Sequence, residues 1–153
     1  MRLLSDLDIK KKKVGLRLDL NVPIKDGVVA DDTRILASLE TLNYLIKAEA
    51  KIVIISHLGR PEEGTFDDQL SLRPVASHLG NELGISISLI NSMKEFSDTN
   101  SQICMLENIR FFEGESKNSD SLAREISADI DVYVFDAFGT SHRKQASTYG
   151  AIK

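Results

Sequence analysis

The chain has 153 residues, of which 42% are hydrophobic and 27% are charged, and its formal net charge is -4. This length is typical of one domain, and no apolar run is long enough to span a bilayer. The acidic balance argues against nucleic acid as a partner, and the one basic cluster, residues 10–13, is interpreted as a solvated entry to the first strand because no aromatic residues interleave with it.

The first predicted elements are a strand over residues 14–20, which Pro23 ends, and a helix over residues 31–50. Asp31 or Asp32 is expected to cap this helix, because a carboxylate can accept a hydrogen bond from a free amide of the first turn. The apolar residues expected on its buried face are Ile35, Leu39, Leu42 and Ile46.

Residues 51–56 form a nearly continuous apolar run, which is typical of a strand buried on both faces of a parallel sheet. The pattern then predicts a helix, a strand, a polar connection, a strand, a helix and a strand, over residues 73–83, 85–90, 91–101, 102–107, 119–127 and 131–138. Strands that alternate with helices predict an α/β fold with a mainly parallel sheet and helices on both faces.

Polar or cationic residues follow four of the predicted strands. In an open parallel α/β sheet, ligands bind beyond the carboxyl ends of the strands, so these residues are expected at one rim. They are Asp19, Asn21, His57, Arg60, Asn108, Arg110, Gly139, Thr140, Ser141, His142 and Arg143. Arg34, in the first turn of the first helix, can join them if the preceding loop folds back.

Converging guanidinium groups repel one another unless an anion lies among them, and arginine is suited to bidentate binding of phosphate or carboxylate. The residues therefore predict a pocket for a small, multiply charged anion. The alternative is that each arginine is a surface residue paired with a nearby carboxylate, as Arg60 could be with Glu62 or Glu63.

Several other sites are not indicated. The chain has neither a G-x-x-x-x-G-K-[ST] loop nor a G-x-G-x-x-G motif after a strand, and its 3 histidines lack metal-ligand spacing. His78 lies within a predicted helix without an evident partner and is interpreted as structural. Ser56 and His57 are adjacent on a strand end, so their side chains point apart. Cys104 is interpreted as a buried apolar residue of a protein from a reducing cytoplasm.

Six blocks of the sequence resemble the amino-terminal half of the phosphoglycerate kinase family in order and spacing, between about residues 14 and 150. The blocks are "RLDLNVP", "DDTRI", "SHLGRP", "LRPVA", "LENIRF" and "DVYVFDAFGTSHRKQAST". The resemblance implies a Rossmann-like three-layer domain that binds 3-phosphoglycerate or 1,3-bisphosphoglycerate. The resemblance implies a glycolytic transferase that reversibly moves a phosphoryl group between this substrate and ADP or ATP with Mg²⁺.

The resemblance also implies the roles of individual residues. Asp19 and Asn21 would bind the glycerate end, Arg34 would be the catalytic residue that stabilises the transferring phosphoryl group, and Arg110 and Arg143 would clamp the non-reacting phosphate. No metal ligand is implied. The implied substrate-binding residues are Asp19, Leu20, Asn21, Arg34, His57, Leu58, Gly59, Arg60, Arg110 and Arg143.

Residues 1–153 are expected to be a single substrate-binding lobe, without the carboxy-terminal lobe that binds ATP or ADP in the family, and so to be inactive alone. The family is generally monomeric, and we expect a cytoplasmic monomer here, with no nucleic-acid or membrane partner. Two alternatives remain: a binding module that retains the lobe without the chemistry, and an unrelated sugar-phosphate enzyme on a similar sheet.

Overall fold

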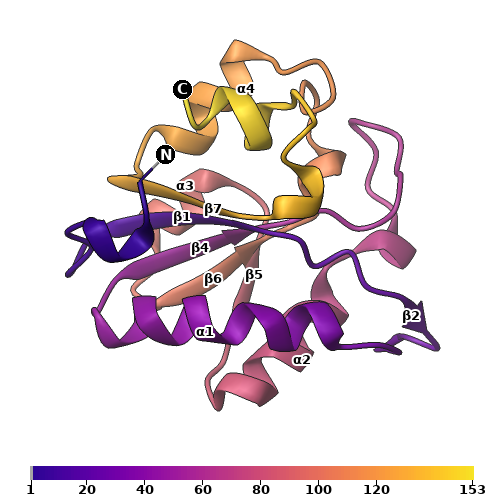
Figure 1. The fold of residues 1–153 in the computed structure, drawn as a ribbon. Helices are drawn as coiled ribbons and strands as arrows, with labels where there is room; N and C mark the ends of the chain where they lie inside the picture. Colours follow the sequence, from indigo (N-terminus) through magenta and orange to yellow (C-terminus); the bar gives the residue numbers. More distant parts are fainter. Residues whose placement is uncertain (1) are drawn as a thin grey trace.

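A five-stranded parallel sheet lies at the centre of the protein, whose residues 2–153 are described by a computed structural model (Figure 1). The strand order is β5-β6-β4-β1-β7. The strands are β1 (Lys13–Leu18), β4 (Lys51–Ile55), β5 (Ser88–Ile90), β6 (Ile103–Leu106) and β7 (Val132–Asp136). The α-helices are α1 (Thr33–Lys47), α2 (Arg73–Leu83), α3 (Met93–Asp98) and α4 (Asp120–Ser127).

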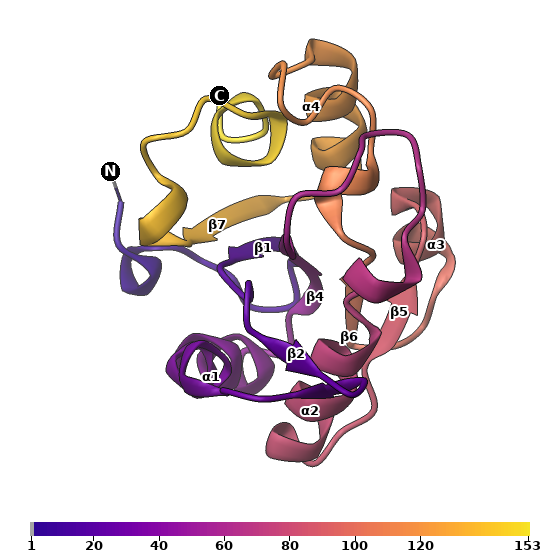
Figure 2. The ribbon, with the colours of Figure 1, turned by 90° about the vertical axis from the view of Figure 1, so that its right-hand side faces the viewer.

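The two faces of the sheet carry separate apolar cores, because successive strand residues point to opposite faces. Ile52 and Ile54 of β4 pack on the face covered by α1 and α2. Val53 and Ile55 pack on the other face with residues of α3 and α4. Figure 2 shows α1 and α2 below the sheet and α4 above it. The predicted three-layer α/β architecture is therefore confirmed, and β4 is buried on both faces as expected.

The predicted elements are present, with ends displaced by a few residues at most positions. The bounds of α2 agree with the prediction, whereas α1 is shorter at both ends than residues 31–50. Its buried line is Ile35, Ser38, Leu42 and Leu45. Leu39 and Ile46, which were expected on this line, are half-buried and pack along its edge.

Residues 91–101 were predicted to be a polar connection, and this prediction was wrong, because they contain α3. The helix begins with a capping box in which Ser92 and Glu95 accept hydrogen bonds from each other's backbone amides. Met93 and Phe96 are its buried side chains. The short helix α3 is thus stabilised within a polar stretch by one capping box and two buried apolar side chains.

Shorter elements complete the chain. An antiparallel hairpin of β2 (Ile24–Lys25) and β3 (Val28–Val29) lies between β1 and α1 and packs against α2, and a turn of π-helix covers Ala146–Gly150. Cys104 is buried, and burial raises the pKa of its thiol to about 12, so the interpretation as an inert apolar residue is supported. Within residues 2–153 no helix is long and apolar enough to cross a membrane.

Candidate anion-binding site

The carboxyl ends of β1, β4, β6 and β7 lie along one edge of the sheet, because these strands are parallel neighbours. The loops that leave this edge carry Asp19, His57, Arg110 and Arg143. Four strands that are far apart in sequence thus place polar and cationic residues on one rim, as the sequence predicted.

Hydrogen bonds join the loops that follow β1 and β4. The amide of Leu20 donates to Oγ of Ser56 at 2.9 Å, and Oδ1 of Asn21 accepts from the amide of Gly59 at 3.0 Å. Gly59 has a φ of 60°, and a Cβ at this position would lie 2.7 Å from a methyl group of Leu70. Only glycine fits this turn without displacing Leu70.

Three of the ten implied substrate-binding residues are buried, at 0% to 4% exposure: Leu20, His57 and Leu58. Leu20 and Leu58 are buried in the apolar core. The amide and carbonyl of Leu58 both bond to the side chain of Asn108, at 3.3 and 2.7 Å. The side chains of Leu20 and Leu58 therefore fix the loops, and neither is accessible to a ligand.

Arg34 turns back from the first turn of α1 toward the loop after β1. Its Nη1 donates to Oδ1 of Asp19 and to the carbonyl of Asn21, both at 3.0 Å. The side chain of Arg34 remains 52% exposed in this position. The structure thus brings Arg34 to the rim, where a carboxylate partly neutralises its charge.

Three arginines line one cavity of about 240 Å³, which we call the arginine cavity: Arg60, Arg110 and Arg143. Within residues 2–153 none of the three has a carboxylate oxygen within 4.0 Å. Nη1 of Arg110 donates to the carbonyl of Gly59 at 2.6 Å, which holds this guanidinium against the loop after β4. The suggested pairing of Arg60 with Glu62 or Glu63 is therefore absent from this part of the chain.

The two carboxylates that also line the cavity are occupied by other donors. Glu63 accepts from the amides of Gly114 and Ser116 at 3.1 and 2.8 Å. Glu115 is buried and accepts from the amide of Ser147 at 2.9 Å and from its hydroxyl. Burial raises the pKa of Glu115, and these hydrogen bonds oppose that effect. The cavity therefore presents guanidinium groups whose charge the neighbouring carboxylates do not pair directly.

Sequence reasoning missed Arg17, which is 1% exposed in β1. Its Nε donates to Oγ of Ser147 at 3.0 Å, and its Nη2 lies 3.1 Å from Nδ1 of His57. Because arginine only donates, Nδ1 of His57 must accept, and the ring proton of the neutral imidazole is on Nε2. An arginine inside an otherwise apolar central strand was the available signal, because such a residue is rarely buried without a specific partner.

Positive charge gathers at this edge strongly enough to affect titration. Burial, and then the charges of Arg17, Arg110, Arg143 and Arg34, lower the pKa of His57 to about 3. Burial also lowers the pKa of Arg110, and the charges of Arg143 and Arg17 add to that effect. The site therefore opposes any further positive charge, and an anion would relieve the repulsion.

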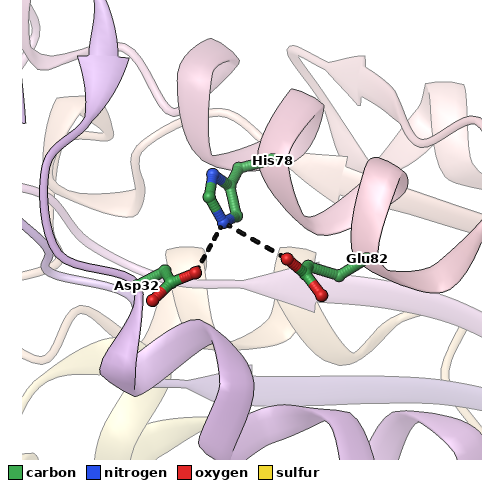
Figure 3. Close-up of side chains that lie close together, drawn as sticks. All are labelled: Asp32, His78 and Glu82. Atoms are coloured by element: carbon green, nitrogen blue, oxygen red, sulfur yellow. Dashed lines mark hydrogen bonds and ion pairs between the residues drawn. The ribbon is translucent and has the colours of Figure 1, made fainter.

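The interpretation of His78 as a residue without a partner was wrong. Its Nε2 lies 3.0 Å from Oδ2 of Asp32 and 3.7 Å from Oε1 of Glu82 (Figure 3). Asp32 precedes α1, 46 positions away in the sequence, so this contact follows from the packing of α1 against α2. Sequence spacing alone could not show it.

The fold and the rim define the class of the protein: an α/β domain with a cationic site at the carboxyl edge of a parallel sheet. The family model for phosphoglycerate kinase matches residues 4–153. The chain belongs to the phosphoglycerate kinase family, which confirms the resemblance seen in its six sequence blocks.

Related proteins agree with this assignment. The chain is 46% identical to the phosphoglycerate kinases of Nitratidesulfovibrio vulgaris and Desulfovibrio desulfuricans, over 98% of its own length but 38% and 39% of theirs. Among solved structures, the Coxiella burnetii enzyme matches 97% of this chain and 38% of its own, with a TM-score of 0.90 and 41% identity. The Pyrococcus horikoshii enzyme matches 98% of this chain and 40% of its own, with a TM-score of 0.84 and 34% identity. The chain thus spans about two fifths of the length of these relatives.

Proposed function

We propose that residues 1–153 are the amino-terminal lobe of a phosphoglycerate kinase and bind 3-phosphoglycerate or 1,3-bisphosphoglycerate. The observation that carries this proposal is the arginine cavity, where three guanidinium groups have no ion-pair partner within residues 2–153. A phosphate dianion satisfies several guanidinium donors at once and cancels their mutual repulsion.

The proposed pose places the non-reacting phosphate in the arginine cavity, bound by Arg60, Arg110 and Arg143. The glycerate end then extends along the rim toward Asp19 and Asn21. His57 is 4% exposed, and in this pose its Nε2–H, a neutral donor, bonds to a substrate oxygen without adding charge. Leu20, Leu58 and Gly59 act through the backbone of the two loops that shape this rim.

Arg34 is the proposed catalytic residue. It lies at the Asp19 end of the rim, where the carboxyl group of 3-phosphoglycerate would reach in this pose. That carboxylate is already ionised at neutral pH, so the attacking oxygen needs no general base, and phosphoryl transfer depends on positioning and on neutralising charge. A guanidinium group that moves from Asp19 to the transferring phosphoryl group would supply such neutralisation.

The arginine cavity does not fit a nucleotide. The arginine cavity of about 240 Å³ is small for one, and the chain has no glycine-rich phosphate-binding motif. Following the family resemblance, we assign ATP or ADP with Mg²⁺, the phosphoryl donor or acceptor of the reaction, to a second lobe outside residues 1–153. A glycolytic role, a cytoplasmic location and a monomeric state are parts of the same proposal.

Calorimetric titration with 3-phosphoglycerate tests the proposed site. We expect saturable 1:1 binding, weakened about 10- to 100-fold by Arg110→Ala or Arg143→Ala, because each removes a charge-assisted contact with the phosphate. Arg124→Ala is the matched control, since Arg124 is exposed on α4 away from the rim.

A folded protein that gives no heat with 3-phosphoglycerate at millimolar concentration would contradict the proposal. Equal loss in all three arginine variants would also contradict it, because the effect would then follow net charge rather than the cavity. Circular dichroism of each variant establishes that the loss is not unfolding.

A further inference from the structure

Asp32, His78 and Glu82 bring three potential metal-ligand atoms together on the side of the molecule that α1 and α2 cover (Figure 3). Asp32 immediately precedes α1, and the other two residues lie one turn apart on α2. None of the three lines the arginine cavity. The cluster is therefore separate from the proposed phosphoglycerate site.

The spacing of the ligand atoms suits a small tetrahedral ion. With zinc–ligand bonds of about 2.0–2.1 Å, two ligands of a tetrahedral site are about 3.3–3.4 Å apart. Nε2 of His78 is 3.0 Å from Oδ2 of Asp32 and 3.7 Å from Oε1 of Glu82, and all three atoms lie within 4.8 Å of one another. These separations bracket the ideal value, so small side-chain rotations suffice to bind an ion.

The charges in the cluster do not cancel. Within residues 2–153 neither carboxylate has a lysine or arginine nitrogen within 4.0 Å, and the imidazole of His78 is the one basic group in contact with them. An imidazole carries at most one positive charge, so two carboxylates leave at least one negative charge uncompensated in either protonation state. A divalent cation bound to the neutral imidazole removes this excess.

The carboxylate of Asp32 is available as a metal ligand because Asp31 makes the hydrogen bonds at the start of α1 that either residue was expected to make. Oδ1 of Asp31 accepts hydrogen bonds from the amide of Thr33 at 2.9 Å and from its hydroxyl at 2.7 Å. Asp32 occupies the N-cap position of α1, yet its side chain makes no capping hydrogen bond. Its carboxylate instead faces His78 on the neighbouring helix.

The donor set selects the kind of ion. One imidazole nitrogen and two carboxylate oxygens suit zinc, whereas magnesium and calcium prefer oxygen ligands alone. The side chains of Asp32, His78 and Glu82 are 39%, 30% and 37% exposed, so water can complete the coordination. The positive end of the α1 dipole opposes a cation, but this costs less than about tenfold in affinity.

We propose that Asp32, His78 and Glu82 form a zinc site that joins the start of α1 to α2. Binding converts the contact at His78 from a hydrogen bond to a coordinate bond, which requires that Nε2 lose its proton to Nδ1 or to solvent. The site also adjoins Arg34, since Asp32 lies two positions before it. Zinc would therefore hold the helix turn that carries the proposed catalytic arginine.

Titration of the chelator-treated, tag-free protein tests this proposal. We expect 1:1 binding of Zn²⁺ by calorimetry, a rise in the unfolding midpoint with zinc, and visible absorption bands of low-symmetry Co²⁺ when cobalt replaces zinc. Loss of a ligand should weaken binding by at least about 100-fold, because even outer-shell changes cost 10- to 100-fold. His78→Ala and Glu82→Gln remove one ligand each.

His142→Ala and Glu125→Gln are the matched controls, because both residues are exposed and lie outside the cluster. They should leave zinc binding unchanged. Glu82→Gln keeps the test valid if His78→Ala does not fold, since an exposed carboxylate on α2 is replaced by a group of the same shape. Absence of saturable zinc binding, or binding that survives both ligand variants, would leave a simple ion pair between α1 and α2 and overturn the proposal. Equal affinity for Mg²⁺ would have the same effect.

Discussion

At one end of the rim Arg34 lies 3.0 Å from the carboxylate of Asp19, whereas at the other end the arginine cavity has no ion pair within residues 2–153. An exposed ion pair of this kind contributes little and exchanges readily with other partners. The unpaired guanidinium groups of the cavity instead repel one another until an anion binds. The comparison suggests that the arginine cavity holds the ligand, whereas the Asp19 end of the rim releases Arg34 to it.

Arg34→Ala is the change with the largest expected effect. In a protein that carries both lobes, we expect kcat to fall about 10³-fold or more, because a guanidinium group that stabilises the transition state is worth at least that factor. Affinity for 3-phosphoglycerate should change by less than about tenfold, since the arginine cavity is intact. Steady-state kinetics that separate kcat from KM measure both effects.

Arg124→Ala is again the control, and Arg34→Lys shows whether charge alone can restore turnover. If Arg34→Ala raised KM strongly and left kcat unchanged, Arg34 would belong to the binding end of the rim. The distinction between the two ends would then be lost.

His57 provides the next test, because burial and the charges of four arginines act on it together. The pKa of His57 is lowered to about 3, whereas a histidine of the unfolded chain titrates near 6.5. Between these values the unfolded state binds a proton that the folded state excludes. The contribution of His57 to stability is thus complete above about pH 6.5 and is lost as the pH falls toward 3, by at most about 1.4 kcal/mol per pH unit.

Urea unfolding between pH 7 and pH 4.5 measures this slope. We expect His57→Asn to flatten it, because an amide oxygen can still accept from Arg17 but does not titrate. Asn43→Ala, at an exposed position without a titratable group, should keep the slope of the unchanged protein. Equal slopes for all three proteins would mean that His57 is not held neutral by its burial and by the positive edge of the sheet.

The sequence predicted the architecture and the rim for one physical reason. Alternating apolar patterns identify strands and helices, and parallel strands bring their carboxyl ends to the same edge. The runs at β4 and β6 therefore placed His57 and Arg110 together without any knowledge of the turns between them. The position of Arg34 required a further guess, that the loop before α1 folds back, and the structure bears this out.

Other features depend on contacts that no local pattern encodes. The local sequence of the strand does not reveal the partner of Arg17. Its side chain donates to Ser147, which lies 130 positions later in the sequence. His78 meets Asp32 only because α1 packs beside α2. The helix α3 was missed because its two buried residues are too few to reveal a helical period.

Asp19→Asn has the smallest expected effect on stability and tests the paired end of the rim directly. We expect the free energy of unfolding to fall by less than about 1 kcal/mol, because Arg34 is 52% exposed and the pair is screened by solvent. The asparagine can still accept from the amide of Asn21, which bonds to Oδ1 of Asp19 at 3.2 Å. Urea unfolding at low and high salt provides the measurement.

A double-mutant cycle of Asp19→Asn with Arg34→Ala measures the energy that the charge of Asp19 contributes to the pair, separately from the other contacts of each side chain. A coupling energy below about 1 kcal/mol fits an arginine that substrate can draw away from its carboxylate. A coupling energy well above about 2 kcal/mol would mean that Asp19 locks Arg34 in place. The catalytic residue would then have to be sought among the arginines that have no such partner.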